Sequence, residues 1–113
     1  MLEFKNGIIY SNSRAVGNIK DGIIRQGTWT TAGHGTIIGN VKDGVIWQGN
    51  WSTPGHGTII GNVRDETVRK GTWSTAGHGT VIGKTRDYKI KGMDDIKSEL
   101  MVACYHFFEK PIF

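Results

Sequence analysis

The amino-acid sequence predicts an all-β fold of repeated β-hairpins, arranged in a curved or closed ring and completed by one apolar C-terminal helix. The first observation is an internal repeat, whose full units begin at Gly22, Gly44 and Glu66, a spacing of 22 residues. The second is a set of Asn-Gly and Asp-Gly pairs between short runs in which Ile and Val alternate with polar residues. The third is a change to helical spacing of the apolar residues after Gly92.

The repeat accounts for most of the chain. Its copies are residues 7–21 (shortened, without the Trp and the Gly-His-Gly segment), 22–43, 44–65, 66–87 and 88–92 (partial). A single repeat cannot bury its own apolar face, so the copies are expected to pack side by side. The length of 113 residues suits one core, and residues 1–113 are therefore assigned to a single domain.

Two-residue turns are expected to join the strands. Asn6-Gly7, Asp21-Gly22 and Asp43-Gly44 are typical of type I′ turns, in which both central residues have positive φ. At Asp65-Glu66 and Asp87-Tyr88 the glycine is missing, so these turns are expected to be strained, longer or of another type. The pairs of runs predict four hairpins, or five if the short segments on either side of Asn6-Gly7 also pair.

Strand alternation assigns side chains to the two faces of the sheet. In residues 37–42 it places Ile37, Gly39 and Val41 on one face and Ile38, Asn40 and Lys42 on the other. In the following run it places Trp51 on the same face as Gly49 and Trp47.

Glycines recur in the middle of the predicted strands, at Gly17, Gly39, Gly61 and Gly83. Glycine weakens a strand, because it has no side chain to pack and a large conformational entropy to lose. Its return at equivalent positions predicts bulges, sharp bends or an aromatic ring lying across the backbone.

A helix is expected over about residues 94–109, with Asp94 or Asp95 as its cap and Pro111 beyond its end. From Leu100 to Phe108 nearly every side of it is apolar, which is typical of a buried helix. A ring of so few hairpins is expected to be too narrow for a helix about 10 Å across. The helix is expected to be buried either in the centre of its own hairpin ring, as a plug, or against a second copy. The narrow ring favours the second site, and the sequence therefore predicts a homo-oligomer.

Three motifs carry a family resemblance: the Gly-Asn-Val/Ile-Lys/Arg-Asp-Gly turns, the Gly-Thr-Trp segments, and the ending Ala-Cys-Tyr-His-Phe-Phe-Glu-Lys-Pro-Ile of residues 103–112. Together they resemble the four-fold β-flower domain over nearly the whole chain. The resemblance implies a ring of short hairpins with a terminal helix, and it implies no particular activity.

A second likeness is to MORN repeats, in which Asp-Gly, an aromatic residue, Gly-x-Trp and His-Gly follow in order. Asp43-Gly44, Trp47, Gly49-Asn50-Trp51 and His56-Gly57 match that order. The aromatic position is Arg25 or Arg69 in two copies, and the stretch from Trp to His is one residue short. This likeness implies a scaffold, in some cases one that binds acidic phospholipid headgroups.

The repeat Trp residues are the main candidates for ligand binding: Trp29, Trp51 and Trp73. Flanked by hydroxyl and amide side chains, they are able to stack on sugar rings, as in repeat-built lectins. The favoured interpretation is nevertheless structural, because a Trp at one place in every repeat most often packs against the next unit. Arg25 and Arg69 are expected to stack on these rings as cation–π partners.

Three Gly-His-Gly segments contain His34, His56 and His78. A ring would be able to bring them together as zinc ligands, in a small metal-dependent enzyme, but their spacing favours simple turn residues and no cofactor. No nucleophile elbow, phosphate-binding loop or carboxylate pair outside turns is present, and Asp94-Asp95 is better explained as a helix cap. Cys104 and His106 point about 200° apart on a helix and cannot act as a pair. We therefore expect a protein that is not an enzyme.

Composition and charge limit the possible binding partners and the cellular location. The net charge of +4 is modest, and Lys and Arg recur singly with Asp beside them, without the clustering that nucleic acid binding needs. There is no stretch long enough to span a membrane, and the lone Cys104 has no disulfide partner, so a cytoplasmic location is expected. The sequence predicts a structural or interaction module that self-associates or binds a protein partner, with carbohydrate binding and a MORN-like scaffold as alternatives.

Overall fold

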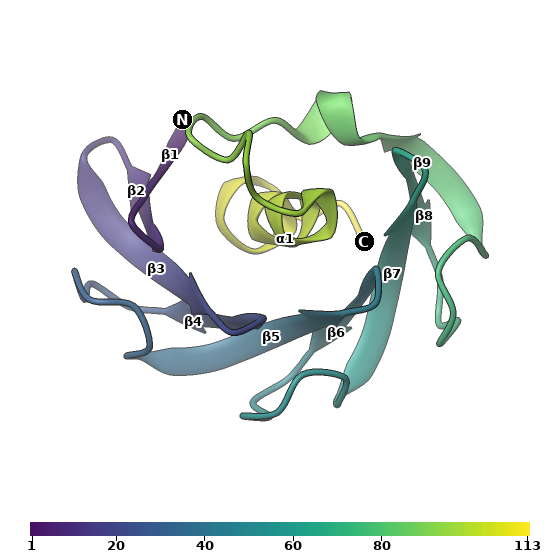
Figure 1. Ribbon diagram of the computed structural model, residues 1–113, viewed down its shortest axis with the longest axis horizontal. Coiled ribbons are helices and arrows are strands. Elements are labelled where there is room, and N and C mark those ends of the chain that lie inside the picture. The colour runs from purple at the N-terminus through teal and green to yellow at the C-terminus, as the bar shows by residue number, and fades with distance from the viewer.

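A computed structural model describes residues 1–113 as one antiparallel sheet and a C-terminal helix (Figure 1). The sheet has nine strands in the order of the chain, each paired with its neighbours in sequence. The strands are β1 (Leu2–Lys5), β2 (Ile8–Ser11), β3 (Arg14–Lys20), β4 (Ile23–Gln26), β5 (Thr36–Lys42), β6 (Val45–Gln48), β7 (Thr58–Arg64), β8 (Thr67–Lys70) and β9 (Thr80–Lys84). The predicted all-β hairpin fold is therefore confirmed.

The sheet curves around the helix but does not close, because β1 and β9 do not pair. A 3₁₀ turn, η1 (Thr85–Tyr88), and the segment after it lie across the gap. The backbone N–H of Phe4 donates to the carbonyl of Lys91 at 2.8 Å, and Glu3 forms a parallel bridge with Lys91. A hairpin predicted across Asp87-Tyr88 is thus wrong, since residues 88–92 meet the opposite end of the sheet instead of pairing with β9.

The remaining hairpin turns have the predicted geometry. Asn6 and Gly7 have φ of 52° and 82°, as a type I′ turn requires. Asp65 and Glu66 adopt the same conformation at 50° and 65°, so this turn is strained, because a Glu occupies the left-handed region usually taken by glycine. In the shortened copy, Asn12-Ser13 forms a further two-residue turn between β2 and β3.

A bulge interrupts every second strand just before its central glycine. Ile24 pairs with Gly39 and Arg25 with Ile37, which leaves Ile38 as the extra residue of β5. The extra residue packs against the core, whereas Ile37 does not. The predicted placement of Ile37 on the same face as Val41, with Ile38 on the other face, is therefore wrong, because the bulge breaks the two-residue alternation. Equivalent register shifts occur at β2/β3, β6/β7 and β8/β9.

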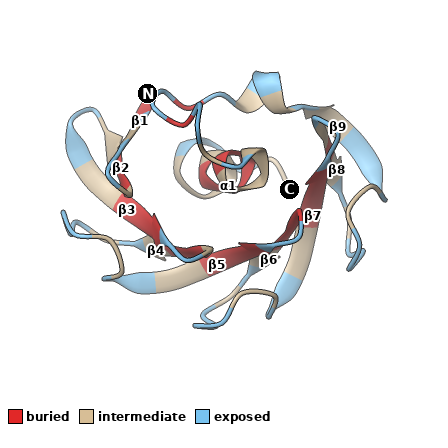
Figure 2. Ribbon diagram, viewed as in Figure 1, coloured by how far each residue is buried: buried red, intermediate tan, exposed pale blue.

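The helix, α1 (Ser98–Cys104), lies inside the curved sheet and continues as a π-helical turn, η2 (Tyr105–Glu109). Met101, Val102, Ala103 and Cys104 are all buried, which confirms the predicted burial (Figure 2). The sheet is therefore wide enough for the helix, and the reason for expecting a homo-oligomer is removed. No helix in the structure has the length and apolar character needed to cross a membrane.

The predicted helix start at residue 94 is wrong. Before α1 the chain forms two successive turns, in which Met93 N–H donates to Ile90 O and Ile96 N–H donates to Met93 O, both at 3.2 Å. Met93, between these turns, is buried in the hydrophobic core. Asp94 lies instead 3.6 Å from the Lys89 ammonium at the surface.

Each central glycine faces an aromatic side chain, which is one of the three explanations predicted for the glycines. The pairs are Gly17 with Phe108, Gly39 with Phe107, Gly61 with Phe113 and Gly83 with Tyr88. At Gly39, an added Cβ would lie 2.6 Å from Cζ of Phe107 and 2.8 Å from the carbonyl oxygen of Trp47. The glycines therefore form sockets into which the rings of the C-terminal region pack.

Candidate ligand-binding loops

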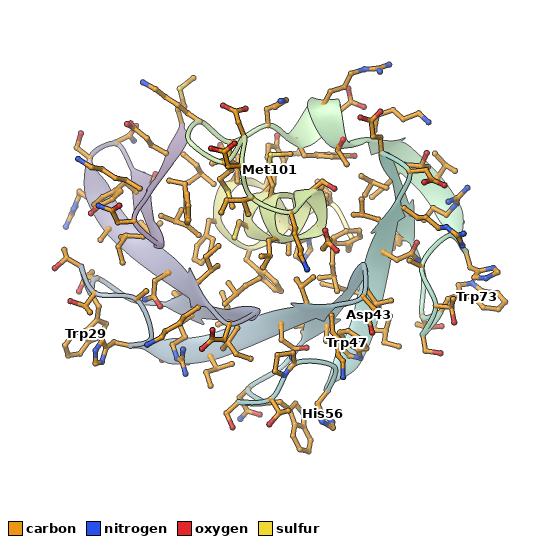
Figure 3. All side chains as sticks on the ribbon, viewed as in Figure 1. Trp29, Asp43, Trp47, His56, Trp73 and Met101 are labelled. Carbon is orange, nitrogen blue, oxygen red and sulfur yellow. The ribbon has the colours of Figure 1, made fainter.

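Three long loops project on the outside of the sheet, and we call them the Trp–His loops: residues 27–35, 49–57 and 71–79 (Figure 3). Their Trp side chains are 54%, 53% and 55% exposed at Trp29, Trp51 and Trp73. The expectation that these rings pack between repeats is therefore wrong. In the second loop, β6 ends at Gln48 and Gly49 adopts φ of 148°, so Trp51 leaves the strand that contains Trp47.

Each loop Trp stacks on the His of its own loop. The ring centroids are 5.0 Å apart in Trp29–His34, 5.3 Å in Trp51–His56 and 5.0 Å in Trp73–His78, with interplanar angles of 28–29°. The ring against the indole is thus His and not Arg25 or Arg69, contrary to the cation–π expectation. The three imidazoles lie on separate loops, so the structure does not bring them together as zinc ligands.

A buried Asn from the preceding hairpin holds each loop against the sheet. Asn40 Nδ2 donates to the carbonyl of His56 at 2.8 Å, and Gly55 N–H donates to Asn40 Oδ1 at 2.7 Å. Asn18 and Asn62 make the same pair of hydrogen bonds to their loops. All three side chains are fully buried, so each amide replaces water for two backbone groups that would otherwise lack partners.

Sequence reasoning missed these Asn residues, although the repeat contains a signal for them. Asn occupies the position after the central glycine wherever a Trp–His loop follows. After Gly83 no loop follows, and the position is the exposed Lys84. The exchange of Asn for Lys indicates that the amide serves the loop and not the strand.

Glycines at the base of each loop support the indole. An added Cβ on Gly57 would lie 2.6 Å from the carbonyl oxygen of Gln48 and 3.3 Å from Cδ1 of Trp51. Gly49, on the other side of the base, lies equally close, with an added Cβ 3.3 Å from the same Cδ1. The indole is therefore fixed by glycine backbone and by His56, while about half of its surface faces solvent.

The titratable groups with shifted pKa values lie away from the loops, around the helix. Burial raises the pKa of the Cys104 thiol, which keeps it protonated and unreactive. Burial lowers the pKa of His106, whose Nδ1 accepts hydrogen bonds from the N–H groups of Ile112 and Phe113 at 2.9 and 3.2 Å. Burial, followed by the charge of Asp87, raises the pKa of Tyr88, whose hydroxyl donates to Ile82 O. Each of these groups supports packing.

Comparison with known proteins finds no matching family, no matching curated protein and no matching solved structure. The likenesses to the β-flower domain and to MORN repeats therefore stay expectations from the sequence.

Proposed function

We propose that this protein is a non-enzymatic recognition module that binds carbohydrate through its three Trp–His loops. The observation that carries the proposal is the exposure of three Trp rings, each held in the same way on a loop of the same design. One exposed aromatic ring is ordinary, but its repetition at the same place on three firmly anchored loops supports a binding role.

The chemistry around each ring suits a sugar. A pyranose has an apolar C–H face that stacks on an aromatic ring, and a rim of hydroxyls that needs polar partners. The second loop supplies such partners in Asn50, Ser52 and Thr53, all exposed beside Trp51. The first and third loops place Thr or Ser at the same positions.

The loops are fixed before a ligand arrives, which favours binding. Since the Asn anchors, the glycines and the His ring already hold the indole, little conformational entropy remains to be lost on association. A Trp on a mobile surface loop would lose more conformational entropy on binding.

The placement of the loops supports binding of more than one glycan chain. Trp29, His56 and Trp73 lie on different sides of the outer surface and point away from one another (Figure 3). Rings that face in different directions do not stack on one short oligosaccharide, so we expect the loops to bind separate glycan chains and cross-link them. Multivalent binding of this kind raises avidity by roughly 10²–10⁴ over a single site when the ligands are presented together.

A glycan array followed by bead agglutination tests the proposal. A glycan found on the array is coupled to beads, which the wild-type protein is expected to cross-link. A variant lacking one of the three loop Trp rings retains two sites and still cross-links the beads. A variant lacking two rings binds the free glycan but no longer cross-links.

Trp47→Phe provides the matched control, because Trp47 lies in β6 outside the loops and its replacement should leave agglutination unchanged. Circular dichroism verifies that each variant is folded. Absence of any glycan ligand, or agglutination that survives loss of all three loop rings, contradicts the proposal. Binding of the wild type to phosphatidylserine vesicles alone would favour the scaffold alternative instead.

A further inference from the structure

The three Trp–His loops differ in what lies beside them. The shortened first copy replaces a long loop with the two-residue turn Asn12-Ser13. Next to that turn is a cavity of about 490 Å³ between two neighbouring hairpins. Ala15 and Val16 form its apolar part, and the rest of the lining is Ser11, Asn12, Arg14, Gln26, Gly27 and Thr28. Its volume lies in the range of small-ligand sites.

The cavity adjoins the first loop. Gly27 lines it, and an added Cβ on Gly27 would lie 3.1 Å from Cδ1 of Trp29. Thr28, the residue before Trp29, also lines it. The edge of the exposed indole therefore lies beside a residue that lines the cavity.

The charge of the cavity is specific to this copy. Arg14 is the first residue of β3, and the equivalent first residues of β5, β7 and β9 are Thr36, Thr58 and Thr80. Arg14 is the one charged residue in the lining, which contains no carboxylate. Arginine has a planar guanidinium that pairs with a carboxylate through two parallel hydrogen bonds.

We propose that this cavity is a subsite for an acidic sugar, whose carboxylate pairs with Arg14 while the adjoining ring stacks on Trp29. The subsite rests on the proposed carbohydrate binding and makes the first loop selective among the three. Amide and hydroxyl groups of Asn12, Gln26 and Thr28 are available for the sugar hydroxyls. The other two loops, with Thr in place of Arg14, have no such cation at that position.

Isothermal titration with two matched oligosaccharides tests the subsite. One ends in glucuronic acid at its non-reducing end, and the other ends in glucose at the same place. The protein is a variant in which Trp51 and Trp73 are both replaced by alanine, so that the first loop alone is measured. We expect the acid-ended sugar to bind about tenfold more tightly, with the difference shrinking as salt is raised.

Arg14→Gln is expected to remove this preference and to leave binding of the neutral sugar unchanged. Arg14→Thr, which restores the residue of the other copies, should do the same. Arg69→Gln removes an Arg remote from the cavity and is the matched control; it should retain the preference. Thermal unfolding of each variant verifies that the fold is intact.

The outcomes separate the subsite from the function on which it rests. Neutral sugar bound without any preference for the acid, or a preference that survives Arg14→Gln, overturns the subsite while carbohydrate binding stands. A preference lost equally in Arg69→Gln shows a general charge effect and also overturns it. Failure of both sugars to bind overturns the subsite together with the proposed function.

Discussion

Phe107 lies across Gly39 so closely that a Cβ atom on this glycine would come within 2.6 Å of the ring. The ring comes from the C-terminal helical segment and the glycine from the middle of β5. Because three further glycines pair with Phe108, Phe113 and Tyr88 in the same way, this contact is the repeating unit by which the C-terminal region is fitted to the sheet.

Gly39→Ala is therefore expected to lower the free energy of unfolding by about 1–3 kcal/mol, as for other overpacked sites. The methyl group would meet both the Phe107 ring and the Trp47 carbonyl. Thermal unfolding measures the loss, and Phe107→Leu in the same chain should recover part of it, because one of the two clashes is relieved. An unchanged unfolding temperature in Gly39→Ala alone would contradict the close packing of Phe107 on Gly39.

Asn40→Ala is expected to destabilise the protein by about 1–3 kcal/mol, since it leaves the His56 carbonyl and the Gly55 N–H without partners. Hydrogen exchange should rise in residues 49–57 in particular, because this loop loses its anchor. Lys84→Ala is the natural control: it changes the equivalent exposed position, which holds no loop, and should be close to neutral. Equal effects of the two changes would disprove the anchoring role.

Trp51→Ala is expected to cost about 1 kcal/mol or less in unfolding free energy, because the ring is 53% exposed and loses mainly its stacking on His56. Chemical denaturation measures this directly. A buried Trp would cost about 3–5 kcal/mol, so a loss in that range would show that the loop is packed.

His106 is expected to make stability fall in mild acid. Burial lowers its pKa below the ordinary 6.5, so the unfolded chain takes up a proton at a higher pH than the folded chain does. The free energy of unfolding therefore decreases as pH falls below about 6.5 and levels off once the folded imidazole is also protonated. The neutral Nδ1 accepts the N–H groups of Ile112 and Phe113, which a protonated ring cannot do.

Denaturation curves collected between pH 8 and pH 5 measure this slope. His106→Asn, which keeps a hydrogen-bond acceptor without titrating in this range, should reduce it. A slope that is the same in the variant would assign the acid sensitivity to other groups.

The hairpins and turns could be predicted from the sequence because their causes are local. A type I′ turn depends on the two residues that form it, and Asn6-Gly7 or Asp43-Gly44 identifies it without reference to the rest of the chain. The bulge at Ile38 could not be predicted, because it depends on how β5 aligns with β4. Because of that single extra residue, simple alternation places Ile37 and Ile38 on the wrong faces.

The candidate site was predicted in its residues but not in its geometry. Trp29, Trp51 and Trp73 stood out by repetition, yet repetition alone does not distinguish a packed ring from an exposed one. What exposes Trp51 is the turn at Gly49 together with the anchoring of the loop by Asn40, a residue of the preceding hairpin. Such a contact between one repeat and the next has no signature in a single copy.

The glycine sockets link the number of repeats to the composition of the C-terminal region. Each additional unit would bring one more empty socket, and each lost unit would leave one aromatic side chain without a place. The number of aromatic residues that fill these sockets therefore equals the number of strands with a central glycine: Tyr88, Phe107, Phe108 and Phe113. Lengthening the array by duplication, which is easy in open repeat proteins, would here require a matching aromatic residue outside the repeat.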